Sequence, residues 1–395
     1  MLMTELIRRG AQYHGPRTAV MFGNEQLTFT EVDRLSNRIA NFFANRAEFE
    51  VGSRVGLLLN NSLFTIPIDF ACAKARISRV PLNTRLSRAE QVQMLTDADV
   101  ETLIFGADLL EPAQELRERL PGLELICVGS HPVGPDLIQL SESESEEHPQ
   151  LIPEPDDVVL VIYTSGTTGR LKAVQHTQAT WASIAENILL NLINVEQDDI
   201  MLHAASMIHA SGTFVLPYWM RGGAAAILSG FQPADYLGAI ERWKPTALNL
   251  VPTMIGMLLD HPGVENVDMR SVGSIVYGAA PMPYPTMQRA LKLWGPRLTQ
   301  YYGQSEVPLC ISVLAKHEHV GPAAERRLSS CGRPSLEIEV RLVDEDGRDV
   351  QQGDAGEIVV RAPTTMSGYY KAEELNAETF LSGNWISHAR CGSVR

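Results

Sequence analysis

The stretch VVLVIYTSGTTGRLKAV, residues 158–174, decides how the fold is read. Its first five residues are apolar and mostly β-branched, which predicts a buried strand. Hydroxyl side chains, glycines and two basic residues follow, with no acidic residue among them. Beyond the loop, Trp181, Ile184 and Ile188 recur at helical spacing. A strand, a glycine-rich loop and a helix in this order are typical of an α/β protein.

The loop has the composition of a phosphate-binding site. Gly166 and Gly169 allow the backbone to approach a ligand closely. The hydroxyl groups and the positive charge come from Thr164, Ser165, Thr167, Thr168 and Lys172. Short donors on a chain that bends easily form the kind of nest that binds an anion. The loop is not a Walker A motif, because two residues separate Gly169 from Lys172 and Ala173 follows the lysine.

Bulk composition narrows the class of protein. The chain has 395 residues, of which 45% are hydrophobic, and its net charge is −14. Such an acidic balance argues against general binding to nucleic acid or to an anionic membrane surface. The five cysteines form no CxxC pair, and no apolar run reaches the roughly 18 residues of a membrane span. We therefore expect a cytoplasmic protein with no membrane span and no nucleic-acid partner.

Three regions follow one another along the chain. Residues 1–150 alternate helix-like and strand-like patterns, and residues 151–330 contain the glycine loop and further short strands. Residues 331–395 alternate apolar and polar side chains, which predicts a small antiparallel β-rich unit. In the first region, Thr30 is a possible cap for a helix that continues towards Ala44. The acidic run at residues 141–147 is expected to be an exposed connection.

Several stretches together resemble the adenylate-forming superfamily of acyl-CoA synthetases, luciferases and adenylation domains. Besides the loop, they are LTFTEVDRLSNRIA, FACAKARISRVPLNTRLSRAEQVQMLTDAD, VYGAAPMP, YYGQSE and GEIVVRAPTTMSGYY. In the second of these, Arg76 stands where glycine is usual. The resemblance covers nearly the whole chain. It implies the large N-terminal domain of this superfamily, with two α/β subdomains that contain mixed sheets and a small antiparallel β-rich subdomain.

The resemblance also implies a reaction in two steps. A carboxylate attacks the α-phosphate of ATP to give an acyl adenylate and pyrophosphate, and a thiol, usually that of coenzyme A, then accepts the acyl group. Residues 164–169 and Lys172 would hold the phosphates, Glu306 would hold Mg²⁺, and Tyr302 could stack on adenine. The nucleotide site would further include Gly278, Ala279, Ala280, Pro281, Tyr301, Gly303, Gln304 and Ser305. Residues with implied catalytic roles are Thr164, Lys172, His209 and Glu306.

His209 matches the position that lines the carboxylate pocket in the family, together with Gly278, Gly303 and Pro308. No Asp lies near His209 to pair with an α-amine, and a buried ammonium without a partner is costly. We therefore expect a carboxylic acid–CoA ligase for a fatty or aromatic acid. Two alternatives stay open: an amino-acid adenylation domain that serves a carrier protein, and a catalytically dead module that binds nucleotide or acyl groups.

The pattern breaks near the end of the sequence. The family places an Asp that binds ribose five residues after a conserved Trp, but here Arg390 follows Trp385 at that distance. The family's small C-terminal domain, which carries the adenylation lysine, has no counterpart in these 395 residues. We expect the chain as written to turn over poorly. One hypothesis is a shift of reading frame, which would restore the Asp.

Overall fold

The predicted strand before the glycine loop is β7 (Val158–Ser165), and it forms an antiparallel hairpin with β8 (Leu171–Thr177). The computed structural model describes residues 1–129, 135–165 and 171–387. The predicted nest residues Gly166, Thr167, Thr168 and Gly169, and Arg390 near the end of the chain, lie outside the described residues. What the structure describes of the loop is therefore its two supporting strands.

The hairpin belongs to a mixed sheet in the first half of the molecule. In spatial order this first sheet contains β18 (Gly368–Tyr369), β8, β7, β4 (Ser78–Pro81), β3 (Arg54–Leu58), β5 (Thr102–Gly106) and β6 (Glu124–Val128). The strands from β7 to β6 are parallel to their neighbours, whereas β8 and β18 pair in antiparallel fashion. Their apolar runs fit a sheet that is covered on both faces.

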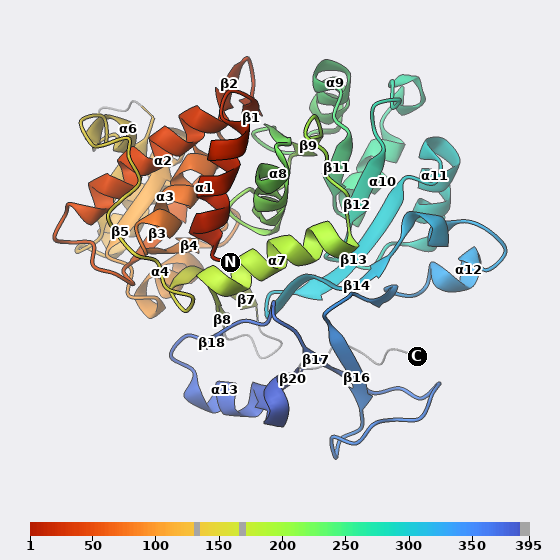
Figure 1. Ribbon diagram of the computed structural model, residues 1–395. Helices are drawn as coiled ribbons and strands as arrows, with labels where there is room; N and C mark the ends of the chain where they lie inside the picture. Colours follow the sequence, from red (N-terminus) through yellow and green to blue (C-terminus); the bar gives the residue numbers. More distant parts are fainter. Residues whose placement is uncertain (130–134, 166–170, 388–395) are drawn as a thin grey trace.

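A second mixed sheet occupies the other side (Figure 1). Its order is β15 (Arg333–Pro334), β14 (Val307–Leu314), β13 (Leu298–Gln304), β12 (Ser274–Tyr277), β11 (Ala247–Leu250), β9 (Ile200–His203), β10 (Ala224–Ile227), β1 (Thr18–Phe22) and β2 (Glu25–Thr28). Each large sheet contains strands from both sides of residue 150, where the first region was expected to end. Strands β1 and β2, from the first 150 residues, belong to the second sheet. Strands β7 and β8, from beyond residue 150, belong to the first sheet.

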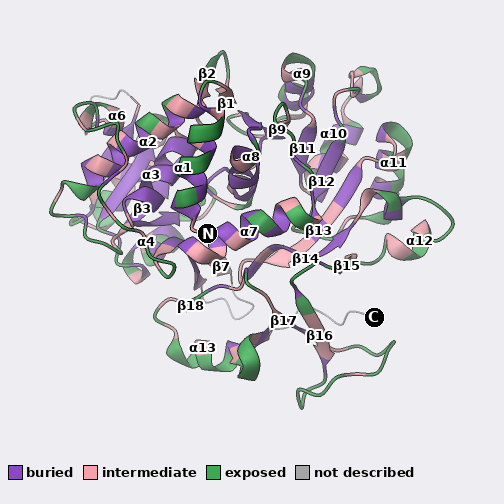
Figure 2. Cartoon of the chain, in the orientation of Figure 1, coloured by how far each residue is buried: buried purple, intermediate pink, exposed green. Residues whose placement is uncertain are grey.

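Helices cover both faces of the two sheets, and their shared layer forms the core between the halves. The outer helices of the first sheet are α4 (Arg88–Asp97) and α5 (Leu110–Arg119), and those of the second are α9 (Pro233–Trp243), α10 (Pro252–Asp260) and α11 (Tyr284–Trp294). The inner helices are α1 (Met3–His14), α2 (Phe29–Ala44), α3 (Thr65–Lys74), α7 (Gln178–Asn191) and α8 (Val215–Arg221). Burial is greatest along the strands (Figure 2).

The start of α2 corrects one expectation. The N-cap is Thr28, not Thr30: the Thr28 hydroxyl accepts from the Glu31 amide at 3.2 Å, and the Glu31 carboxylate accepts from the Thr28 amide at 2.7 Å. The reason lies in the spacing, since Thr28 has an acidic residue three positions later and thereby completes a capping box. Thr30 lies inside the first turn of the helix.

The predicted antiparallel unit at the end of the chain is confirmed. It contains β16 (Glu339–Val343), β17 (Glu357–Arg361), β20 (Trp385–Ser387) and β19 (Phe380–Leu381). The short helix α13 (Glu373–Thr379) lies between this unit and the first sheet (Figure 1). The remaining helical segments are α6 (Leu137–Leu140), α12 (Ala324–Arg327), η1 (Ala107–Leu109), η2 (Ala210–Phe214), η3 (Val264–Asn266), η4 (Lys316–His319) and η5 (Ser382–Asn384).

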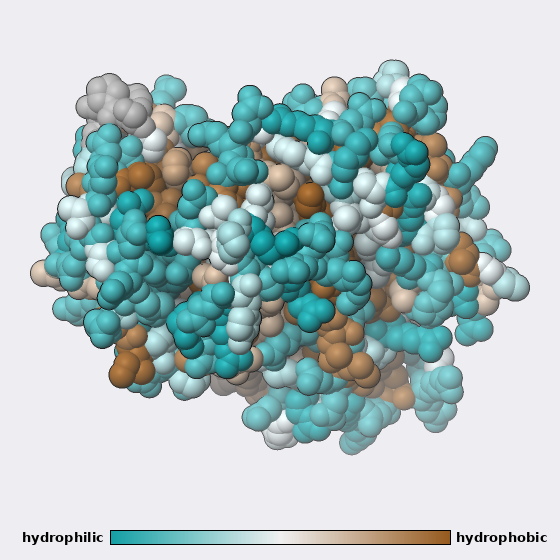
Figure 3. Space-filling view, turned by 45° about the horizontal axis from the view of Figure 1, so that its top comes forward, coloured by the Kyte–Doolittle hydropathy of each residue, from teal (hydrophilic) through white to brown (hydrophobic). Residues whose placement is uncertain are grey.

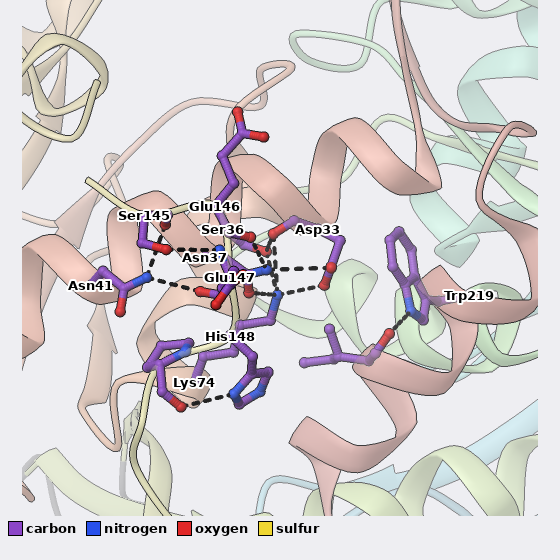
Figure 4. Close-up of polar contacts among 12 residues, drawn as sticks. Asp33, Ser36, Asn37, Asn41, Lys74, Ser145, Glu146, Glu147, His148 and Trp219 are labelled. Atoms are coloured by element: carbon purple, nitrogen blue, oxygen red, sulfur yellow. Dashed lines mark hydrogen bonds and ion pairs between the residues drawn. The ribbon is translucent and has the colours of Figure 1, made fainter. Parts of the chain in front are cut away.

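A buried lysine joins α2 to α3 (Figure 4). Lys74 is fully buried, and its ammonium donates to Asp33, Ser36 and Asn37, each at 2.7 Å. The Asp33 carboxylate compensates the buried charge, and the oxygens of Ser36 and Asn37 accept the remaining hydrogen bonds. The acidic run at residues 141–147 is mostly exposed, as expected, but it is also fixed to α2, where Asn41 donates to two of its carbonyls at 2.9 Å.

On the face seen in Figure 3, hydrophilic residues dominate and apolar residues appear in small separate groups. Among the described helices, none combines the length and the apolar character that crossing a bilayer requires.

Candidate active site

The two strands of the β7–β8 hairpin bring Thr164 and Lys172 opposite each other at the base of the glycine loop. Both side chains are partly exposed, as residues that serve a ligand must be. The Lys172 ammonium lies 5.3 Å from the centre of the Tyr369 ring. Ser165 closes the described part of β7, paired with Leu171. The predicted phosphate loop is therefore anchored at Thr164 and Lys172.

Glu306 lies in the tight turn between β13 and β14, not at the start of a helix. Its carboxylate Oε1 accepts a hydrogen bond from the Tyr369 hydroxyl at 2.7 Å, and its carbonyl accepts from the Met366 amide at 2.8 Å. Burial, and then the contact with Glu306, raise the pKa of Tyr369, so this hydroxyl stays protonated and donates. Tyr369 thus links the predicted metal ligand to the predicted phosphate lysine.

Two glycines of the predicted nucleotide site allow close packing beside this turn. A Cβ at Gly278 would come within 2.5 Å of the Tyr301 ring and carbonyl, and a Cβ at Gly303 within 2.6 Å of the Leu309 backbone. Any larger residue would push the strands apart. Ala279 adopts a positive φ of 65°, and Ala280 and Pro281 are exposed after it. The segment from Gly278 therefore presents backbone to the surface beside β13.

A cavity of about 250 Å³ lies beside these elements. The predicted residues that line it are His209, Ala279, Tyr301, Gly303, Gln304, Ser305 and Pro308. Gly278 is not part of the lining, because its backbone packs against Tyr301. Tyr302 points elsewhere and packs against the core of the β-rich unit. The cavity thus unites the predicted acid-pocket residue His209 with most of the YYGQSE stretch.

Two imidazoles in the cavity, that of the buried His176 and that of the half-buried His209, are neutral near pH 7. Burial first, and the charge of Arg79 second, lower the pKa of His209 to about 4. Its Nε2 has no hydrogen-bond partner among the described residues. Burial also lowers the pKa of His176 to about 4, and its Nε2 donates to the Ser305 carbonyl at 2.7 Å. A neutral His209 can offer a hydrogen bond to a carboxylate without adding a charge.

Sequence reasoning missed several residues of this site. Arg79, His176 and Trp181 line the cavity, and Tyr369 contacts Glu306, although its stretch suggested only a structural role. One signal was available for Arg79, since a charged residue inside the apolar strand segment ISRVPL needs a partner. No local pattern indicated Tyr369, because its contact depends on the antiparallel pairing of β18 with β8.

The oxygen ligands at Glu306 suit a magnesium ion that is bound together with a nucleotide. Mg²⁺ keeps several waters and binds one or two carboxylates together with phosphate oxygens. Glu306 supplies one carboxylate beside the phosphate-loop base, and no group of three or more His, Cys, Asp or Glu side chains suited to a metal occurs in the described part of the chain. A closed metal cage is therefore absent from residues 1–129, 135–165 and 171–387.

Comparison with known proteins gives the class. The sequence profile of the family described as AMP-binding enzyme matches residues 7–370. The medium/long-chain fatty acid–CoA ligase FadD8 of Mycobacterium tuberculosis is 33% identical over 383 residues, and a feruloyl-CoA synthase of Amycolatopsis is 32% identical over 394. The match covers 94% of this chain and 66% of the first relative, and 98% and 75% for the second. The chain belongs to the AMP-binding, adenylate-forming enzyme family.

Solved structures agree with this fold. The amide bond synthetase McbA of Marinactinospora thermotolerans superposes with a TM-score of 0.86 at 25% identity, over 98% of this chain and 75% of that one. The N-terminal domain of FACL13 from M. tuberculosis superposes with a TM-score of 0.89 at 23% identity, over 100% and 97% of the two chains. The fold is thus that of the large N-terminal domain of adenylate-forming enzymes, as the sequence predicted.

Proposed function

We propose that the chain is the adenylating part of an AMP-forming carboxylic acid–CoA ligase. The observation that carries this proposal is the cavity that contains His209, which adjoins the YYGQSE turn and whose described lining includes no Asp or Glu. A pocket without a carboxylate suits an acid that lacks an amine, because an ammonium buried there would stay unpaired. The relatives support it: their names specify ligases for fatty, feruloyl and 2-succinylbenzoate acyl groups.

In the first step, a carboxylate oxygen attacks the α-phosphorus of ATP. The new bond joins that oxygen to phosphorus, while the bond to the β-phosphate oxygen breaks and pyrophosphate leaves. Thr164 and Lys172 hold the phosphates at the loop base, and His209 orients the carboxylate through its free nitrogen. Bound Mg²⁺ at Glu306 would supply positive charge to the phosphate oxygens. Charge that develops around phosphorus requires cations and donors fixed in advance.

In the second step, the thiol sulfur of coenzyme A attacks the acyl carbon and AMP leaves. The proposed acids are fatty or aromatic carboxylates, as for the relatives named above. ATP and coenzyme A are the co-substrates. We also propose a cytoplasmic location, where both are available.

Exchange of labelled pyrophosphate into ATP tests the first step. Aryl and fatty acids are expected to support exchange, slowly in the chain as written, and the twenty common amino acids are not. Exchange with an amino acid alone would favour an adenylation domain that serves a carrier protein. Tight binding of AMP and acyl-adenylate analogues without any exchange would favour a catalytically dead module, and absence of such binding would overturn the proposal.

A further inference from the structure

Arg79 of β4 is a cation buried beside the acyl cavity. It is 5% exposed and lines the cavity. Its Nε lies 2.5 Å from Asp69 Oδ1, although the two atoms are not aligned for a hydrogen bond. Its Nη1 is buried and has no hydrogen-bond partner among the described residues, and its Cζ lies 4.9 Å from the centre of the Trp181 ring. A guanidinium with free donors is therefore held in an apolar wall.

Asp69 supplies a counter-charge to Arg79 but leaves donors of the guanidinium unused. Burial raises the pKa of Asp69, and the charge of Arg79 opposes this effect. The same cation contributes to the lowered pKa of both His176 and His209, which places its field inside the cavity. A guanidinium has five donors and loses stability when they are buried unused. A ligand that brings an acceptor would satisfy them.

Contacts connect Arg79 to the nucleotide side of the cavity through two aromatic rings. The Ser305 carbonyl, which belongs to the nucleotide stretch, contacts His176 at 2.7 Å. The His176 ring lies 6.0 Å from the Trp181 ring, and Trp181 in turn contacts Arg79. The cavity of about 250 Å³ is smaller than the roughly 300–1,000 Å³ that is typical of small-molecule pockets. A compact acyl group suits this volume.

We propose that the preferred acid is compact and carries a second oxygen acceptor, an oxo or a carboxylate group, which Arg79 binds while the other end of the acid is activated. This substrate class rests on the proposed ligase function. A simple hydrocarbon acid would leave the donors of Arg79 unsatisfied and would lose the contact that an oxygen acceptor gains. Arg79 is thus a specificity residue for the acyl group.

The test uses acylsulfamoyl adenosines, stable analogues of acyl adenylates, titrated into this chain by calorimetry. One pair carries 4-phenylbutanoyl and 4-oxo-4-phenylbutanoyl groups, and the other carries hexanoyl and 5-carboxypentanoyl groups. The oxygen-bearing member of at least one pair is expected to bind about tenfold tighter, as for a hydrogen bond to a charged group. Which pair shows the preference distinguishes an oxo group from a carboxylate.

Variants test whether Arg79 binds the second oxygen acceptor of the acyl group. Arg79→Met should reduce the preference to within about twofold, and Arg79→Lys should keep part of it. The control is Arg270→Met, which removes an arginine whose side chain is 90% exposed and should keep the full preference. A preference that survives in Arg79→Met would overturn the role of Arg79.

The comparison of the four analogues in the unchanged protein does not depend on whether any variant folds. If it binds both members of both pairs within about twofold, the proposed substrate class is wrong while the ligase proposal stands. If neither AMP nor any of the four analogues binds, the proposed function itself is overturned.

Discussion

At the scale of single residues, the contacts of Arg76 explain how an arginine can occupy a position where the family usually has glycine. It adopts a positive φ of 59°, a conformation that favours glycine. Its guanidinium makes two bonds to the Asp157 carboxylate, both at 2.7 Å, and both side chains are largely buried. The backbone strain at this position is therefore offset by a paired contact that glycine could not make.

Arg76→Gly is expected to destabilise the protein by about 0.5–2 kcal/mol. Hydrogen bonds between charged groups contribute about 1.5–3 kcal/mol, and relief of the left-handed strain returns about 1 kcal/mol. Urea denaturation measures the difference. In an Asp157→Ser background only the relief remains, so there the same substitution should be neutral or stabilising. A gain in stability in the unchanged background would contradict this explanation.

Glu306→Gln should remove the magnesium-dependent part of ATP binding, because a hard cation requires the carboxylate charge. The amide keeps the size of the side chain and can still accept from Tyr369. The expected loss is about ten- to hundredfold in affinity with Mg²⁺ present and little without it. Titration of ATP with and without Mg²⁺ measures this effect, with the exposed Glu374→Gln as control. A full magnesium effect in the mutant would exclude Glu306 as the ligand.

At the scale of elements, the short strand β18 carries Tyr369 to the site and is held by one side chain of α13. Asn376 accepts from the Tyr369 amide at 2.7 Å and donates to the Tyr369 carbonyl at 2.8 Å. Gly368 has a φ of 142°, and a Cβ at this position would lie 3.3 Å from the side-chain oxygen of Asn376. A larger residue would therefore crowd the contact between Asn376 and Tyr369. The position of Tyr369 therefore depends on Asn376.

Asn376→Ala is expected to lower the free energy of unfolding by about 1–3 kcal/mol, because two backbone groups of β18 lose their partners. It should also weaken ATP binding, since Tyr369 no longer supports Glu306. Denaturation and titration measure the two effects on the same samples. The control is Asn194→Ala, where the side chain is exposed. Lower stability with unchanged ATP affinity would mean that Tyr369 holds its position without Asn376.

Elements were predictable where one local pattern was enough. The apolar run before the loop, the helix that contains Trp181 and the alternation of the last unit all correspond to observed elements. The cap of α2 was assigned to Thr30, although the spacing of Thr28 and Glu31 contained the signal. The sheet membership of β1 and β7 was not predictable from sequence order, since it depends on pairing with distant strands.

For the candidate site, motif matches named seven of the sixteen described residues that line the cavity, including His209 and Ser305. They did not predict Arg79 or Tyr369. Both act through contacts made across the fold, with Asp69 and with Glu306, and neither contact leaves a regular spacing in the sequence.

At the scale of the whole molecule, neutral histidines make stability depend on pH. The folded pKa of His209 is about 4, below the ordinary 6.5. Below pH 6.5 the unfolded chain therefore binds a proton that the folded chain does not, and stability is full above this pH and falls as the pH decreases towards 4. His176 has the same shift and the same sign.

His209→Gln is expected to reduce the stability lost between pH 7 and pH 5 by roughly 2 kcal/mol. Urea denaturation of the two proteins at both pH values measures this difference. The matched control is His317→Gln on the surface, which should leave the loss unchanged. An equal loss in His209→Gln and in the unchanged protein would show that His209 does not stay neutral when folded.

The position of β1 has a consequence for synthesis on the ribosome. This strand lies between β2 and β10, and its parallel partner β10 follows roughly 200 residues later. At about 5–20 residues per second, the nascent chain waits on the order of 10–40 s before that partner emerges. During this interval one edge of the first hairpin and the part of α1 that packs on α8 have no native cover, although α2 and α3 are already available to α1. The amino-terminal segment is therefore where a chaperone would act first.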